Sequence, residues 1–135
     1  NELKTLKEQS SGGELARFNL AIKSLVSARH RSLCLIFDEI DTGISGEVAW
    51  RMGQLIRSLA GGHQILMITH SPQIAAHATI QYHVSKITEQ DKDRSSIQYL
   101  TPPQRIIELA KMLSGDPPSK AALSNAESLI KAVKH

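Results

Sequence analysis

Hydrophobic positions along this chain follow two periods, and the change between them marks the predicted elements. Apolar residues at three- and four-residue steps form one face of a helix, whereas short apolar runs and strict alternation indicate strands. Helical spacing covers about residues 10–30, 46–60, a short segment opened by Ser71-Pro72, and segments that begin near 101 and 119. The inner face predicted for the second helix is Val48, Met52, Leu55, Ile56 and Leu59.

The order of the elements predicts an α/β fold. Apolar runs at about 33–37 and 64–69 predict two strands that alternate with helices, which favours a parallel sheet with right-handed crossovers. Farther on, alternation from Ile80 to Val84 predicts a strand, and a charged turn over 89–94 joins it to an antiparallel return over 97–100. We therefore predict parallel strands with flanking helices, an antiparallel hairpin and a helical C-terminal tail, in a single domain over residues 1–135.

Acidic residues follow the first apolar run directly. The run predicts a fully buried parallel strand, and it ends at Phe37, after which come Asp38, Glu39 and Asp41. Carboxylates are costly to bury unless paired or metal-bound, but parallel sheets bind ligands at their carboxyl edge. This is the form of a Walker B element, in which Asp38 faces a hydrated Mg²⁺ and Glu39 polarises a water for attack on a phosphate. The alternative is a buried strand before a helix N-terminus, where acids are favourable on electrostatic grounds alone.

Two further segments hold candidate chemistry. Ser11-Gly12-Gly13-Glu14 opens the first predicted helix, where glycines let backbone N–H groups approach an anion and the helix N-terminus adds partial positive charge. A capped helix start explains this tetrapeptide equally well. His70 lies at the predicted carboxyl end of the second strand, so we expect it near the acidic end of the first strand.

Composition excludes some classes of function. Hydrophobic residues make up 41% of the chain and charged residues 21%, which is enough for a packed core. The net charge of +3 permits contact with nucleic acid without arguing for it, and an aromatic content of 4% argues against a base-stacking platform. Cys34 is the lone cysteine, and its place in an apolar run predicts a buried thiol. The lack of a disulfide framework and of a bilayer-length apolar run favours a cytoplasmic protein.

The ordered set of motifs resembles the ATP-binding-cassette (ABC) ATPases. In that family a Ser-Gly-Gly element is the signature motif, an acid-ended strand is Walker B, the following turn is the D-loop and a histidine is the switch. Within it, the chain is similar to the RecN-like bacterial DNA repair proteins, relatives of the SMC and Rad50 proteins. The matching segments are SGGELAR at 11–17, FDEIDTGISG at 37–46, ITHSPQIAA at 68–76 and AKMLSG at 110–115.

The resemblance implies ATP and Mg²⁺ as cofactors and assigns a role to each matching residue. Glu39 orients or deprotonates the attacking water, and His70 contacts the γ-phosphate. The remaining assignments are Asp38 for Mg²⁺ through water, Ser11, Gly12, Gly13 and Glu14 for a nucleotide held mainly by the opposite head, and Asp41 for a D-loop contact across the dimer. The implied partners are a second head in an ATP-sandwiched homodimer and, for the intact protein, DNA.

The Walker A motif is missing from these 135 residues. No G-x-x-x-x-G-K-[ST] occurs, so the chain lacks the cradle for the α- and β-phosphates. In RecN-like proteins that loop lies in an N-terminal lobe, beyond a long coiled coil. The resemblance thus implies the C-terminal half of an ATPase head, inactive alone, with exposed apolar surface that the N-terminal lobe would cover. The alternatives are a fragment of a transporter cassette, against which Asp41-Thr42-Gly43 argues, and a non-catalytic module that only docks on an N-terminal lobe.

Overall fold

A computed structural model of the chain describes residue 21 and residues 34–89 and 92–133. The first predicted helix, with the Ser11–Glu14 signature segment at its start, lies outside these residues apart from position 21, which is helical. The chain divides into two compact units, one up to Ile74 and the other from Ala75 onward. The prediction of a single domain over residues 1–135 stays a prediction. In the described part of the chain, no helix combines the length and the apolar character needed to cross a membrane.

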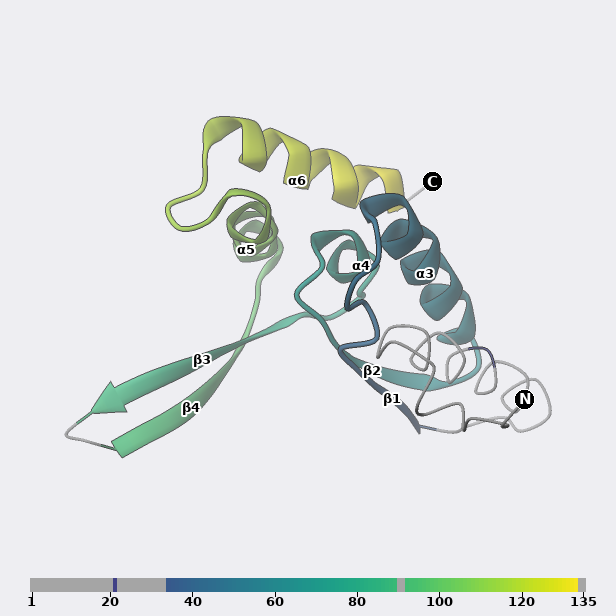
Figure 1. The fold of residues 1–135 in the computed structure, drawn as a ribbon, viewed down its shortest axis with the longest axis horizontal. Coiled ribbons are helices and arrows are strands. Elements are labelled where there is room, and N and C mark those ends of the chain that lie inside the picture. The colour runs from purple at the N-terminus through teal and green to yellow at the C-terminus, as the bar shows by residue number, and fades with distance from the viewer. Residues whose placement is uncertain (1–20, 22–33, 90–91, 134–135) are drawn as a thin grey trace, which may run out of the picture. The chain divides into compact units, whose positions relative to one another are not determined.

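The first unit is built on a pair of parallel strands. Strand β1 (Cys34–Asp38) pairs with β2 (Gln64–Ile68), and the Cα partners run from Cys34 opposite Gln64 to Asp38 opposite Ile68. Helix α3 (Gly46–Leu59) is the connection between the two strands, and the short helix α4 (Pro72–Ala76) follows β2 (Figure 1). A parallel pair requires such a crossover, which confirms the order predicted for this half of the chain.

One face of this strand pair forms the core of the unit. Alternation along β1 turns Leu35 and Phe37 inward, and Phe37 is only 2% exposed. Ile40, just past the strand, joins them. The buried core cluster consists of Leu35, Phe37, Ile40, Ala49, Met52, Ile56 and Ile74, with Ile44, Leu59, Ile65 and Met67 packed against it.

Helix α3 confirms the predicted bounds, but its buried face differs from the predicted one. Met52 and Ile56 are buried as expected, whereas Val48 and Leu55 are each 42% exposed. Two small residues take the inner positions instead, Ala49 and Gly53. The prediction was wrong because it weighed only large apolar side chains, and small residues allow a helix backbone to lie close to a sheet.

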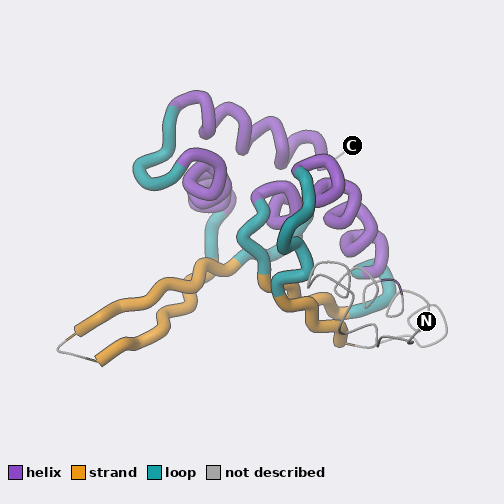
Figure 2. The backbone as a smooth tube through the Cα atoms, in the orientation of Figure 1, coloured by secondary structure: helices purple, strands orange, loops and turns teal. Residues whose placement is uncertain are grey.

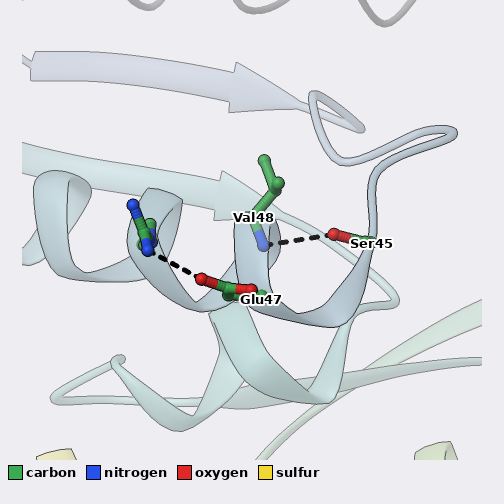
Figure 3. A network of polar contacts seen from close by, with 4 residues as sticks. Ser45, Glu47 and Val48 are labelled. Carbon is green, nitrogen blue, oxygen red and sulfur yellow. Dashed lines mark hydrogen bonds and ion pairs between the residues drawn. The ribbon is translucent and has the colours of Figure 1, made fainter.

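The N-terminus of α3 is capped locally. The backbone N–H of Val48 donates to the Ser45 hydroxyl at 3.4 Å (Figure 3), which satisfies one of the free donors of the first turn. Glu47 lies in the same turn, where a negative charge interacts favourably with the positive end of the helix dipole. Its carboxylate accepts a hydrogen bond from Arg51 at 2.7 Å. These contacts define where the helix begins after the turn that follows β1.

The second unit contains an antiparallel hairpin and two helices (Figure 2). Strand β3 (Tyr82–Glu89) pairs with β4 (Lys92–Tyr99), and helices α5 (Pro102–Ser114) and α6 (Lys120–Val133) follow. The hairpin and both helices were predicted correctly. The turn between the strands is shorter than the predicted 89–94, because β3 ends at Glu89 and β4 begins at Lys92. Pairing continues to Glu89 opposite Lys92.

Small and apolar residues bring α5 and α6 together. Leu109 and Ala110 of α5 are fully buried, as is Ala126 of α6, and Ala122 is nearly so. Both helices start where predicted: the Gln104 side chain accepts from the backbone N–H of Thr101 at 2.9 Å, and Ala122 N–H donates to the Ser119 hydroxyl at 3.1 Å. The predicted α/β class, with parallel and antiparallel strand pairs and C-terminal helices, is therefore confirmed.

Candidate functional site at the carboxyl ends of β1 and β2

The carboxyl end of β1 presents two exposed acidic residues. Asp38 is the last residue of the strand and lies opposite Ile68 in the register. The backbone N–H of Glu39 donates to the Ile68 carbonyl at 3.0 Å, so the ladder continues one residue beyond the strand. Both acidic residues are exposed, which frees their carboxylates for a ligand at this edge.

Glu39 adopts a backbone conformation that is uncommon for a residue with a side chain. Its φ of 47° lies in the left-handed region, at a cost of about 1–2 kcal/mol. The turn that follows is tied locally, since the Thr42 hydroxyl donates to the Glu39 carbonyl at 3.1 Å and Gly43 takes a φ of 72°. The turn directs Ile40 into the core while Glu39 stays at the surface. Strained residues that the surrounding structure holds in place cluster at functional sites.

Asp41 points inward from the same turn. It is only 6% exposed, and its Oδ2 accepts hydrogen bonds from the Thr69 hydroxyl and, at 3.2 Å, from the backbone N–H of Ser71. The Ser71 N–H is shared with the Thr69 hydroxyl at 2.9 Å. The other oxygen, Oδ1, is buried without a hydrogen-bond partner among the described residues. Asp41 therefore links the turn after β1 to the segment after β2.

His70 lies at the corresponding end of β2, between the two residues that bind Asp41. Its side chain is exposed, whereas Thr69 and Ser71 are half-buried. Because β1 and β2 are parallel and in register, Asp38, Glu39 and His70 come to the same edge of the sheet, as the motif order predicted. The signature residues Ser11, Gly12, Gly13 and Glu14 lie outside the described residues.

The arrangement fits a hydrated magnesium ion. Mg²⁺ prefers oxygen ligands and keeps several waters, so one or two carboxylates at a site are enough when phosphates supply the rest. Asp38 and Glu39 supply such oxygens at the exposed edge. No group of three or more His, Cys, Asp or Glu side chains suited to hold a metal by themselves occurs among residues 34–89 and 92–133. That donor set is consistent with a metal shared with a bound nucleotide.

The partners of Asp41 were not predicted from the sequence. Thr69 and Ser71 flank the predicted switch histidine, but nothing in their spacing points to a carboxylate 28 or 30 positions earlier. The sequence signal was the presence of a third acidic residue, Asp41, so soon after Asp38 and Glu39. It lies five residues before α3, too far from the first turn to be explained by the helix dipole. A polar residue at a core-facing turn position indicates a specific hydrogen-bond partner.

Among the described residues, large apolar side chains on the opposite face of the strand pair are exposed. Ile36 of β1 and Leu66 and Ile68 of β2 are each at least half exposed, and Cys34 is exposed too. The predictions of a fully buried strand and a buried thiol were therefore wrong, since alternation places Cys34 and Ile36 on this second face. Exposed apolar surface, expected for half of a head, is confirmed.

Comparisons with known proteins agree on one group. No family model matches the chain. It is 40% identical over 128 residues to the DNA repair protein RecN of Haemophilus influenzae, covering 95% of the chain and 23% of that protein. For the RecN proteins of Bacillus subtilis and Deinococcus radiodurans the identities are 36% and 40% over 129 residues, covering 96% of the chain and 22% of each protein. The chain thus spans less than a quarter of the length of the curated relatives it matches.

A solved structure shares the fold. It comes from work described as structural biochemistry of ATP-driven dimerization and DNA stimulated activation of SMC ATPases. The TM-score is 0.61 at 23% sequence identity, and the match covers 79% of this chain and 64% of that chain. At this identity the likeness establishes the fold alone.

Proposed function

We propose, since this chain belongs to the RecN family of DNA repair proteins, that it forms the C-terminal lobe of an ABC-type ATPase head. The intact protein would use this head in recombinational repair of DNA double-strand breaks. The observation that carries the proposal is the shared sheet edge, where Asp38 and Glu39 at the end of β1 lie beside the strand that ends before His70. Matches to RecN proteins over about 95% of the chain support it.

Each residue at this edge has a proposed task. Asp38 binds the water shell of Mg²⁺, which supplies charge neutralisation at the phosphates when it is bound. Glu39 accepts a proton from, or orients, the attacking water, and the turn that fixes its φ also holds its side chain at the exposed edge. His70 contacts the γ-phosphate. Ser11, Gly12, Gly13 and Glu14 are proposed to bind a nucleotide held mainly by the opposite head.

The proposed partner within the head is a Walker A lobe, because the chain has no Walker A motif of its own. The bare faces of both sheets support such a partner. In addition to Ile36, Leu66 and Ile68 on β1 and β2, one face of the hairpin exposes Tyr82, Val84, Ile97 and Tyr99. Cross-strand register pairs Tyr82 with Tyr99 and Val84 with Ile97, so these side chains form a continuous apolar surface. Surfaces of this kind mark protein interfaces.

Further partners follow from the proposed head. A second head would close over ATP, and hydrolysis would release the pair, which couples nucleotide state to assembly. DNA would be engaged by the intact protein, in the bacterial cytoplasm at the nucleoid. A transporter cassette is disfavoured by the 36–40% identity to RecN proteins. The competing non-catalytic docking module would share the apolar faces but would not need Glu39.

The experiment that tests the proposal is a pair of glutamate substitutions in the full-length protein. Glu39→Gln should lower kcat for ATP hydrolysis by about 100- to 10,000-fold, the range for loss of a general base. Glu47→Gln is the matched control, because Glu47 is an exposed glutamate of α3 whose recorded partner is Arg51. Wild-type turnover by Glu39→Gln would overturn the proposed catalytic role and favour the docking module.

A further inference from the structure

The loop that carries His70 is held at both of its flanks by one carboxylate. Oδ2 of Asp41 accepts from the Thr69 hydroxyl on one side and from the Ser71 backbone N–H at 3.2 Å on the other. The Thr69 hydroxyl also accepts from Ser71 N–H at 2.9 Å, which closes a three-membered network around the histidine backbone. Two hydrogen bonds to one carboxylate oxygen are directional restraints on a loop.

The same carboxylate belongs to the turn that carries Glu39. Asp41 follows Glu39 by two residues, and Glu39 is itself tied to β2 through its N–H and the Ile68 carbonyl at 3.0 Å. Glu39 has a left-handed φ, and within this turn the Glu39 side chain is exposed while that of Asp41 is buried. Thus the geometry of the candidate base and that of the switch histidine depend on a single short segment.

The Asp41 carboxylate is buried, and burying it costs free energy that an apolar side chain at this position would not. Asp41 is 6% exposed, and its Oδ1 is buried with no hydrogen-bond partner among the described residues. An apolar residue of similar size would fill this position without leaving a buried acceptor unsatisfied. A half-satisfied carboxylate in the core therefore needs a reason other than stability.

We propose that Asp41 is a positioning residue that couples Glu39 to His70 by fixing the backbone of the His70 loop through Thr69 and Ser71. The inference rests on the proposed function and deepens it. A contact by Asp41 across a dimer would first have to break both of its internal bonds, so the role assigned here lies within its own lobe. Asp41 acts on the reaction through His70 and does not touch the substrate.

The test uses Thr69, where a conservative pair of substitutions separates the hydrogen bond from the shape of the side chain. In the full-length protein, Thr69→Val removes the hydroxyl and keeps the branched shape, whereas Thr69→Ser keeps the hydroxyl. We expect Thr69→Val to lower kcat by about 10- to 100-fold, the scale of a small misplacement of a catalytic group, with KM for ATP little changed. Thr69→Ser should restore most of the loss. Asp41→Ala should resemble Thr69→Val, and if that variant fails to fold, the threonine pair still decides.

A double substitution identifies the route of the effect. If Asp41 and Thr69 act through His70, the Thr69→Val/His70→Ala protein should be no slower than His70→Ala alone, because the group being positioned is gone. Multiplicative losses in the double variant would overturn the proposal, as would a wild-type kcat for Thr69→Val or a change confined to KM. Loss of turnover in Glu39→Gln together with a normal Thr69→Val would refute this inference alone. Normal turnover in Glu39→Gln would refute the proposed function beneath it.

Discussion

The two units of the chain use polar side chains in contrasting ways. In the unit up to Ile74, the decisive polar contacts are buried at the strand ends, where Asp41 binds Thr69 and Ser71. In the unit from Ala75, the ion pairs lie nearer the surface: Lys111 bridges Glu108 at 3.1 Å and Asp116 at 3.2 Å, while His77 is the buried polar residue among the described ones. Exposed ion pairs contribute little to stability and attach one element to another. A buried carboxylate is especially costly, so Asp41 beside the exposed acidic residues at the strand ends marks the candidate site.

Both units leave large apolar side chains exposed on a strand pair. Each strand pair exposes large apolar side chains on one face, Ile36 and Leu66 in the first unit and Val84 and Ile97 in the second. A chain that buried all of its apolar surface would not leave two such faces. The comparison predicts that both faces meet other protein in the intact molecule, while the polar edge of the first unit alone supplies chemistry.

The largest effect on stability is expected from truncating a side chain on the buried face of β1, compared with its neighbour on the exposed face. Phe37→Ala should lower the free energy of unfolding of the 135-residue chain by about 3–5 kcal/mol, because Phe37 is 2% exposed in the core. Ile36→Ala should cost far less, since Ile36 is 53% exposed. Urea unfolding of the two variants measures the difference. Equal destabilisation would mean that the second face is covered within this chain.

A smaller effect is expected in the second unit at Lys111. Hydrogen bonds from its ammonium to Glu108 and Asp116 raise the pKa of Lys111 above its ordinary value of 10.5. The ion pairs therefore add stability below pH 10.5, and this contribution is lost as the pH rises through the raised pKa. We expect Lys111→Met to lower Tm slightly at pH 7, with the gap from wild type shrinking at pH above 10.5.

Lys120→Met, at an exposed lysine that begins α6, is the control for the Lys111 measurement. It should leave both Tm and its pH dependence near those of the wild-type chain. A gap between wild type and Lys111→Met that stayed constant through the alkaline range would contradict the assigned ion pairs.

Much of the fold could be predicted because its signals are local. Apolar runs located β1 and β2, helical spacing located α3, α5 and α6, and Ser45 and Ser119 stand where caps are needed. The acidic end of β1 and the position of His70 after β2 were enough to place both at one sheet edge, because parallel strands share their carboxyl ends. Periodicity and strand direction therefore sufficed for the exposed part of the site.

The rest depended on partners distant in sequence. The run around Cys34 and Ile36 looked fully buried because an apolar pattern does not reveal whether the covering surface lies in the same chain. The buried face of α3 was predicted wrongly because small residues such as Ala49 and Gly53 do not stand out in a pattern of large apolar side chains. The inward turn of Asp41 requires the left-handed φ of Glu39 and the Thr69 hydroxyl, neither of which leaves a local signal.

The central claim is that this chain holds the metal and water side of an ATPase head and needs a second lobe to grip nucleotide. Steady-state ATP turnover by the chain alone, and then with an added N-terminal lobe that carries Walker A, tests it most directly. The account predicts background turnover for the chain alone, hydrolysis on mixing, and none when the chain carries Glu39→Gln. Strong hydrolysis by the chain alone, or equal hydrolysis by the Glu39→Gln mixture, would contradict it.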